Sequence, residues 1–600
     1  MHLINTATLE LEEFFDRART PPYAILSHTW EDGEVSFQEW DHLETRKEKK
    51  GFLKIESFCQ LASQDGYTHA WVDTNCIDKR SSAELSEAIN SMFAWYQEAA
   101  FCYVYLADVS FPDTTIWSDL EIQLLNSKWF TRGWTLQELI APRRILFYDQ
   151  DWRFIGGKHS LVDAIYKATG INKECLLGHA SPSDFSVAAI MSWAASRVTT
   201  RLEDQAYCLL GLFGVNMPLL YGEGGKAFLR LQEEIIRVSD DQSIFVYDIP
   251  TQSMTAPLAN SPALFSKSTD IIRWFRLAAP TAMTPPFYAM TNAGLSISLP
   301  LIQTLSPDFV LGVLNCTTRI EEQHARSAVC IPLSSHNNDY RRQFTRVSLP
   351  APWISLSSAS MKTLLQWHEG NASPPDDLSS EFIPEESTNI MICMLDEENR
   401  ERLWRRGFEP LKQTEGTFNK VSCFITFPRG FSGYRLHAVD PPEALHEYTS
   451  LMAMLDQRIS DRKGRSLLIF RVPGSGGDDG SYIGIYLEAA LDNEGALQDW
   501  PRACRILPNW NKQDGLDVAM QLNENFPPSS ASLVGNILVT IRTAIPINPN
   551  FSLSMTAALM VEIVFDMDRV RRFHSQKGPI SNSFSSGQYF RMLDTLSESG

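Results

Sequence analysis

Glu138 is the residue of this chain whose type and position best suit catalysis. It lies four residues after Trp134, so the two side chains share one face of any helix that contains them. A carboxyl group beside an indole, close to the edge of a sheet, can have its pKa shifted and can take part in a reaction. The alternative is an ordinary ion pair of Glu138 with Arg132 or Arg143 on a solvated helix face.

The stretch around Glu138 predicts the elements that hold it. Residues 127–148 read S-K-W-F-T-R-G-W-T-L-Q-E-L-I-A-P-R-R-I-L-F-Y. The first part predicts a short helix that stops at Pro142, because proline cannot continue a helix. The apolar run at 144–148 then predicts a strand that follows directly.

The residues before this stretch predict an α/β core over residues 1–160. Apolar runs alternate there with amphipathic runs, which is typical of a parallel sheet flanked by helices. An acidic amphipathic run at 9–17 predicts a turn of helix ahead of the first buried strand. The predicted strands are 23–27, 70–73, 101–107 and 145–148, and the main helices are 47–64 and 83–99.

Polar residues follow the ends of these predicted strands. In an open α/β sheet, ligands bind outside the carboxyl ends of the strands, so we expect these residues to meet at one edge. They are Ser27, His28 and Trp30 after the first strand, Asp73 and Asp78 after the second, and Asp108 after the third. A crevice with aromatic walls and one carboxylate suits cleavage of a glycosidic bond, because the carboxylate stabilises an oxocarbenium ion.

Over the rest of the chain, the predicted type of secondary structure changes twice. Residues 161–242 predict a helical extension of the core. Short β-branched segments then predict an all-β region, a sandwich or a barrel, in two lobes at 243–370 and 388–575. A linker rich in Pro, Ser and acidic residues, 371–387, divides the lobes, and 576–600 is a flexible tail.

Composition excludes several classes of function. A formal net charge of −19 argues against a protein that coats nucleic acid. Ten cysteines are spread singly, which indicates reduced thiols in an intracellular protein and a cytoplasmic location. The sequence shows neither a signal peptide nor an apolar run long enough to cross a membrane. Scattered histidines without ligand spacing predict no catalytic metal.

Two other chemical motifs are weaker. Cys76 is the one thiol placed for nucleophilic chemistry, after a strand, although a buried core thiol fits the same pattern. Residues 222–226 read G-E-G-G-K, but they lack the spacing of a phosphate loop and no strand precedes them.

Five phrases in the first part of the chain form a recognisable set. They are P-P-Y-A-I-L-S-H-T-W at 21–30, A-W-V-D-T-N-C-I-D-K at 70–79, S-S-A-E-L-S-E-A-I-N-S-M-F-A-W-Y at 81–96, R-G-W-T-L-Q-E-L-I-A-P-R at 132–143 and M-P-L-L-Y-G-E-G at 217–224. Together they resemble the fungal heterokaryon-incompatibility (HET) domain. One departure from the family pattern is Asn75, where a small residue or cysteine is expected.

HET domains look like distant relatives of TIR domains, which implies a TIR-like (flavodoxin-like) α/β core. Residues 23–27 resemble the first TIR strand, and W-T-L-Q-E-L at 134–139 resembles the TIR phrase W-C-L-x-E-L. The glutamate of that phrase cleaves NAD at the nicotinamide–ribose bond in enzymatic TIR domains. The resemblance therefore implies that Glu138 is catalytic, with NAD as a substrate and no resident cofactor.

The resemblance also implies roles for the surrounding residues. Ser27, His28 and Trp30 would line the nucleotide cleft. Asp73 and Asp78 flank a loop that gates the cleft or forms self-association contacts in TIR domains. Asp108, Arg132 and Trp134 complete the residues that we expect to contact substrate.

The family implies a role in fungal non-self recognition that ends in programmed cell death. One hypothesis is an effector enzyme that cleaves NAD once HET domains self-associate. A second is a non-enzymatic module that triggers death by recruiting partners, and a third is a decayed member that regulates active paralogues. The β-rich region resembles the uncharacterised domain that often follows HET domains, and it would offer a surface to protein partners.

Overall fold

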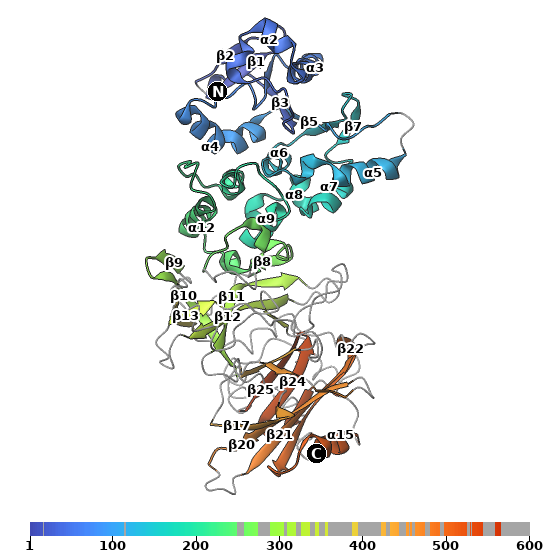
Figure 1. Ribbon diagram of the computed structural model, residues 1–600, viewed down its shortest axis with the longest axis vertical. Helices are drawn as coiled ribbons and strands as arrows, with labels where there is room; N and C mark the ends of the chain where they lie inside the picture. The colour runs from blue at the N-terminus through green and yellow to red at the C-terminus, as the bar shows by residue number, and fades with distance from the viewer. Residues whose placement is uncertain are drawn as a thin grey trace, which may run out of the picture. The chain divides into compact units, whose positions relative to one another are not determined.

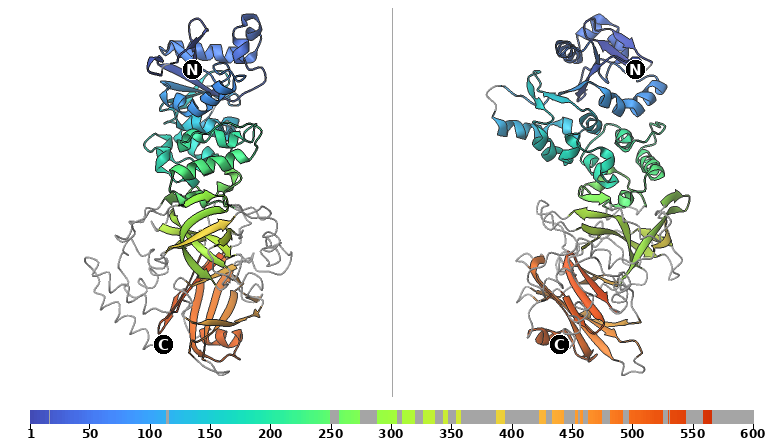
Figure 2. Two further views of the ribbon diagram at one scale, coloured as in Figure 1. Left: turned by 90° about the vertical axis from the view of Figure 1, so that its left-hand side faces the viewer. Right: turned by 180° about the vertical axis from the view of Figure 1, so that it is seen from behind.

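The structure, a computed structural model of the 600-residue chain, consists of two compact units. The first comprises Met1–Tyr247 and Leu258–Asp270, and the second comprises Asp248–Pro257 and Ile271–Gly600. Helices are frequent in the first unit and strands dominate the second (Figures 1 and 2). The structure describes residues 1–15, 17–112, 116–248, 257–273, 288–304, 309–319, 326–335, 343–346, 354–357, 387–393, 422–427, 433–442, 452–454, 456–458, 463–474, 481–491, 497–524, 529, 531–543 and 558–565.

A mixed sheet forms the centre of the first unit. Its described strands lie in the order β2-β1-β4-β3-β5-β6-β7. The four central strands are parallel, and β1, β2 and β7 add antiparallel edges. The strands are β1 (His2–Asn5), β2 (Leu11–Glu13), β3 (Tyr23–His28), β4 (His69–Trp71), β5 (Phe101–Tyr105), β6 (Ile145–Tyr148) and β7 (Phe154–Gly157).

The order of the parallel strands creates a switch point. Counted along the chain, β3, β4, β5 and β6 are the first to fourth parallel strands, and their order in space is second, first, third, fourth. This is the beginning of the flavodoxin-like order, in which the chain leaves the first strand to one side and returns on the other. Ligands bind at the carboxyl ends of the two strands where this reversal occurs, which here are β3 and β5.

Strand β3 is the most deeply buried element of this sheet. All six of its residues are buried, because parallel strands in α/β folds have both faces covered. The apolar run Y-A-I-L therefore positions two polar residues, Ser27 and His28, inside the fold at its carboxyl end.

Helices connect and cover the strands of this core. The two predicted main helices are confirmed, although the first begins at Lys50 and follows a separate short helix. The predicted helical turn at 9–17 is wrong, because Leu11–Glu13 pairs with β1 as an antiparallel strand. The helices are α1 (Phe37–Trp40), α2 (Leu43–Lys47), α3 (Lys50–Gln64), α4 (Ser82–Glu98), α5 (Trp117–Asn126) and α6 (Thr135–Ile140).

The predicted helical extension forms a bundle of short helices within the same unit. Its longest helix, α12, presents an apolar stripe that includes Phe228, Leu231 and Ile235. Residues 258–270 also belong to this unit, beyond the boundary expected at residue 242. The helices are α7 (Val162–Thr169), α8 (Lys173–Leu176), α9 (Val187–Ala194), α10 (Asp204–Tyr207), α11 (Leu210–Phe213) and α12 (Lys226–Val238).

The described part of the second unit consists almost entirely of strands. One sheet contains β8 (Ile271–Arg273), β9 (Tyr288–Thr291), β10 (Gly294–Thr304), β11 (Phe309–Arg319), β12 (Arg326–Ser335), β13 (Gln343–Arg346), β14 (Ile354–Ser357), β15 (Ser387–Cys393), β16 (Ser422–Phe427), β18 (Met452–Met454), β23 (Ala531–Val534), β24 (Ile537–Thr543) and β25 (Ala558–Val564). The other contains β17 (Arg435–Asp440), β19 (Asp456–Arg458), β20 (Lys463–Arg471), β21 (Tyr482–Leu491) and β22 (Leu497–Trp510), and one helix, α15 (Leu516–Glu524), accompanies it.

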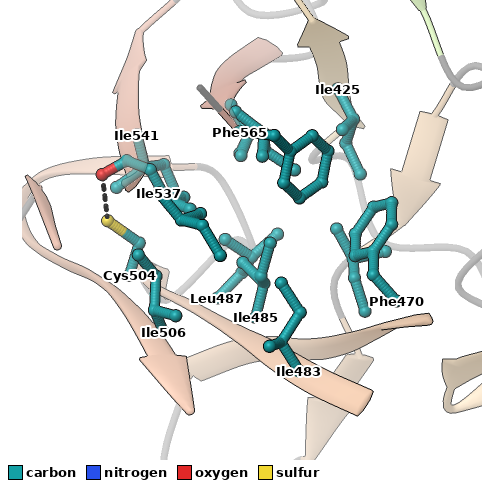
Figure 3. Packing of buried hydrophobic residues seen from close by; sticks show 14 of the residues in the cluster. Ile425, Phe470, Ile483, Ile485, Leu487, Cys504, Ile506, Ile537, Ile541 and Phe565 are labelled. Atoms are coloured by element: carbon teal, nitrogen blue, oxygen red, sulfur yellow. Dashed lines mark hydrogen bonds between the residues drawn. The ribbon is translucent and has the colours of Figure 1, made fainter. Parts of the chain in front are cut away.

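Side chains from both of these sheets share one hydrophobic cluster (Figure 3). Ile541 comes from the first sheet, and Phe470 and Ile485 come from the second. Cys504 also lies in this cluster, where its thiol donates to the carbonyl of Val539 at 3.4 Å. The described residues of the second unit are therefore rich in strands, as expected, and a sandwich or a barrel stays a prediction.

The strand pairing crosses the expected division into two lobes. β10 belongs to the first predicted lobe, yet it pairs with β15 and β16 of the second. Most of the predicted linker at 371–387 and all of the predicted tail at 576–600 lie outside the described residues. No helix in the described part of the chain is long and apolar enough to cross a bilayer.

Candidate active site

Glu138 lies at the switch point of the sheet. It is carried by α6, which ends at Ile140 because Pro142 follows and cannot continue the helix. Strand β6 begins at Ile145, so the predicted sequence of helix, proline and strand is confirmed. Helix α6 packs against β3, which brings Glu138 to the carboxyl end of that strand.

The carboxyl group of Glu138 is held by a short hydrogen-bonded chain. The Ser27 hydroxyl donates to Oε2 of Glu138 at 2.5 Å, and Nε1 of Trp129 donates to Ser27 Oγ at 2.9 Å. Tyr96, whose hydroxyl donates to the Leu26 carbonyl at 3.0 Å, also lies beside the Glu138 carboxyl. We call Trp129, Ser27, Glu138 and Tyr96 the Glu138 network, and all four side chains are buried.

Burial gives Glu138 an unusual proton affinity. Loss of water around the carboxyl and the negative charge of Asp73 raise the pKa of Glu138 to about 8, despite the opposing effects of Ser27, Arg132 and Tyr96. The group is therefore mostly protonated at neutral pH in this state. Only 6% of the residue is exposed, and the described residues place no cation within ion-pair distance of it.

A second set of contacts begins at the next residue of β3. Nε2 of His28 lies 3.2 Å from Oδ1 of Asp73, and Nε1 of Trp30 donates to Oδ2 of Asp73 at 2.9 Å. The ammonium group of Lys79 lies over the Trp30 ring, 3.7 Å from its centroid. We call these four residues the Asp73 network.

Asp73 keeps its charge although it is largely enclosed. Burial raises the pKa of its carboxyl, but the hydrogen bond from His28, the positive charge of Lys79 and the Trp30 indole outweigh that effect and lower it to about 2. The pKa values of the two carboxyl groups near the switch point are thus shifted in opposite directions, so that Asp73 is ionised and Glu138 is mostly neutral at pH 7.

The structure brings five of the predicted site residues into these two networks: Ser27, Glu138, His28, Trp30 and Asp73. Arg132 is half-buried beside them, and its charge lowers the pKa of Glu138. Arg132 forms no ion pair with Glu138 within the described residues, and neither does Arg143. The alternative of a solvated helix face is therefore wrong for Glu138.

The remaining predicted site residues make other contacts. The Trp134 side chain lies beside the carboxyl of Asp204 in the helical extension. Asp108 accepts hydrogen bonds from the Ser127 hydroxyl and the Lys128 backbone amide, both at 2.7 Å, and so caps the turn before α6. Their contacts with a substrate stay a prediction.

Asp78 is also engaged in local structure. Its Oδ1 accepts from the side chain of Gln38 and from the backbone amide of Arg80, the latter at 2.9 Å. Asp78 therefore fixes the turn that leads into α4. It has no hydrogen bond to Asp73 among the described residues, so the two do not form a carboxyl pair there.

Sequence reasoning did not assign three residues of the networks to the site. Tyr96 falls on the apolar stripe of the predicted helix at 83–99, and the sequence patterns give no role to Trp129 or Lys79. A donor role for an indole or phenol is visible only once its acceptor is placed. Cys76, by contrast, is buried and burial raises the pKa of its thiol, which disfavours the nucleophilic role.

Within the described residues, no group of three or more histidine, cysteine or acidic side chains is arranged to hold a metal ion. The eight cysteines whose side chains the structure describes are all free and buried.

Comparison with known proteins finds similarity to one family over part of the chain. Residues 23–119 match the model of the family described as heterokaryon incompatibility protein (HET). "Vegetative incompatibility protein HET-E-1" from Podospora anserina is 50% identical over 224 residues, which cover 36% of this chain and 16% of that protein. The chain thus spans a small part of the length of this relative. No solved structure matches the chain.

These matches show that part of the chain is similar to heterokaryon-incompatibility proteins. The family match contains Ser27, His28, Trp30 and Asp73, and it ends before Glu138.

Proposed function

We propose that this chain is an effector of fungal heterokaryon incompatibility whose first unit cleaves NAD at the nicotinamide–ribose bond. The family match and the relative named as a vegetative incompatibility protein support the biological role. A TIR-like reading of the fold is supported by the order of the four parallel strands.

The observation that carries the enzymatic proposal is the position of Glu138. It lies at the reversal between β3 and β5, held by the last residues of β3, where a flavodoxin-like sheet binds nucleotides. A carboxyl at that point, with a strongly raised pKa, has the features of a functional group more than those of a surface ion pair.

The proposed reaction requires one carboxylate and one water. The bond between the ribose C1′ and the nicotinamide nitrogen breaks, and its electron pair leaves with nicotinamide. Ionised Glu138 stabilises the positive charge that develops on the ribose ring. Water then attacks C1′ and releases a proton, which gives ADP-ribose.

Substrate itself favours the ionised form of Glu138. The nicotinamide ring of NAD carries a positive charge, and a cation beside a carboxyl lowers its pKa. Binding would therefore drive a proton from Glu138 when the carboxylate is needed. The pKa of about 8 belongs to the free protein, so kcat/KM should depend on pH near that value, whereas kcat should depend on pH at a lower value.

The Asp73 network offers groups for the remainder of the dinucleotide. Trp30 is 44% exposed, and Lys79 lies over its ring. An exposed indole suits stacking with a base, and an ammonium group beside it suits the diphosphate.

The decisive experiment measures NAD consumption and nicotinamide release by the purified full chain, with and without a fused domain that clusters it. Glu138→Gln keeps the shape and the acceptor oxygen but removes the ionisable group. Glu174→Gln is a matched control, because the Glu174 side chain is 64% exposed. We expect Glu138→Gln to reduce turnover at least about 100-fold and Glu174→Gln to leave it unchanged.

A different outcome would favour the second function. If clustered wild-type protein consumes no NAD, yet cells expressing it die and Glu138→Gln kills as well, the chain recruits partners without catalysis. One observation favours this alternative: Ile116, Trp117 and Ile122, in and beside α5, are 61%, 52% and 58% exposed, which is typical of a protein contact surface.

A further inference from the structure

We infer that Arg197, from the helical extension, is a positioning residue for Glu138. It fixes the start of α6, which carries Glu138, and the loop whose indole holds Ser27. Its role in catalysis rests on the proposed function, whereas the restraint on α6 follows from the contacts alone.

A backbone bridge first joins the extension to the loop before α6. Val198 N donates to the Thr131 carbonyl at 2.7 Å, and Gly133 N donates to the Val198 carbonyl at 2.9 Å. This pairing brings the two segments very close. A methyl group added at Gly133 would lie 2.4 Å from Cγ2 of Thr199, so the approach requires glycine at this position.

Arg197 is inserted next to this bridge. The residue is buried, with 7% exposure, and its Nη1 donates to the Arg132 carbonyl at 2.8 Å and to Thr135 Oγ1 at 3.0 Å. Its Nε donates to the Trp193 carbonyl at 3.1 Å, which anchors it to the end of α9. Burial lowers the pKa of Arg197 to about 10, so the guanidinium remains charged at neutral pH.

These contacts lead to Glu138 by two routes. Thr135 and Glu138 belong to the same short helix, so fixing Thr135 fixes the helix that carries the carboxyl. Thr135 Oγ1 also lies 2.5 Å from the Trp129 carbonyl, to which it donates. The indole of Trp129 in turn donates to Ser27, whose hydroxyl donates to Glu138.

A six-residue helix needs such external restraints. Isolated helices of this length are unstable in water, so tertiary contacts must hold α6 in place. Its opposite end is held by buried Lys158, whose Nζ donates to the carbonyls of Leu139 at 3.2 Å and Pro142 at 2.9 Å. Arg197 is thus the restraint at the end that also reaches Trp129 and Ser27.

Hydrogen exchange in the full chain tests the restraint directly. Arg197→Met should accelerate exchange of the amides in residues 129–141 about tenfold, while exchange in β3 and β5 stays unchanged. Arg237→Met is the matched control, because Arg237 lies on α12 with its side chain 67% exposed. If the wild type consumes NAD, Arg197→Met should lower kcat about tenfold or more and change KM less than twofold.

A conservative pair protects the test against unfolding of the Arg197 variant. Thr135→Val keeps the shape but removes the hydroxyl, and Thr135→Ser restores it. We expect faster exchange at 129–141 in the valine variant and near-wild-type exchange in the serine variant. The inference is overturned if Arg197→Met and Thr135→Val both exchange like Arg237→Met in this segment.

The two proposals fail in different ways. An altered exchange pattern with no NAD consumption in any protein, the wild type included, would contradict the proposed function and support the restraint. Normal exchange at 129–141 with intact turnover in Arg197→Met would support the proposed function and overturn the inference.

Discussion

Ser27 and Glu138 are separated by 111 residues in sequence, yet their side chains share a hydrogen bond of 2.5 Å. The bond joins the carboxyl end of the central strand β3 to the short helix α6. Because the Ser27 hydroxyl also accepts from Trp129, its single proton is directed at Glu138. Strand β3 and helix α6 are therefore fixed relative to each other before any substrate binds.

The raised pKa of Glu138 predicts a pH-dependent stability that is independent of enzymatic activity. The folded state holds the proton up to about pH 8, whereas an unfolded glutamate releases it near 4.5. Between these values the folded state binds more protons, so stability falls as the pH rises. Glu138→Gln removes this loss and should be more stable than the wild type at pH 9, by at least about 1 kcal/mol.

Thermal unfolding at pH 5 and pH 9 checks this prediction. The melting temperature of Glu138→Gln relative to the wild type should rise between the two pH values. Glu174→Gln, which alters an exposed carboxyl, should show no such change. An equal difference at both pH values would contradict a buried, mostly neutral Glu138.

Asp73→Asn should shift the pH dependence of turnover to lower pH. The charge of Asp73 raises the pKa of Glu138, so removing it makes Glu138 ionise more easily. The measurement is the midpoint of kcat/KM against pH, and Asp163→Asn, at a side chain that is 74% exposed, serves as the control. A midpoint that moves upward would show that the two carboxyl groups are not coupled as described.

Trp30→Ala should weaken substrate binding more than it slows the reaction. Loss of one base-stacking contact would raise KM about tenfold. Trp30→Phe keeps an aromatic face and should retain most of the affinity, although it loses the hydrogen bond to Asp73. Trp117→Ala removes another exposed indole and should not change KM. Equal KM values for Trp30→Ala and Trp117→Ala would exclude a stacking role.

Gly133→Ala should destabilise the first unit by about 1–3 kcal/mol, because its new methyl group collides with Thr199. Thr199→Ser removes the colliding Cγ2 and keeps the hydroxyl that donates to the Arg201 carbonyl at 2.6 Å. The double variant should therefore recover most of the lost melting temperature. If the double variant recovers none of the melting temperature, the close approach of these segments does not explain the glycine at position 133.

Much of the core and the centre of the site could be predicted from sequence patterns. Buried parallel strands read as apolar runs, and their carboxyl ends collect at one edge, which placed Ser27 and Asp73 near Glu138. The pattern also gave the helix that Pro142 terminates. These features depend on local periodicity and on one rule of topology.

The contacts that the sequence did not predict depend on long-range geometry that no local pattern contains. Asp108 follows a strand as expected, and its carboxyl accepts from the Ser127 hydroxyl and the Lys128 backbone amide in the turn before α6. Arg197 lies 62 residues from Thr135, and nothing in its neighbourhood marks it as a support for α6. Pairing between distant strands likewise joined β10 to β15 across the linker predicted at 371–387.

The segment at 258–270 determines where this chain can be cut. The buried amide of Gln232 on α12 donates to the Ala259 carbonyl at 2.8 Å and accepts from the Ala259 backbone amide at 3.1 Å. A fragment that stops at residue 242 loses both bonds, and the amide nitrogen of Gln232 keeps only the Phe228 carbonyl at 3.0 Å. Loss of the donor to its buried oxygen costs about 1–3 kcal/mol. Deletion experiments that test whether the β-rich region is needed for the proposed function should therefore end the fragment after Asp270. Loss of function in a shorter fragment would report a damaged fold and would not show that the β-rich region is needed.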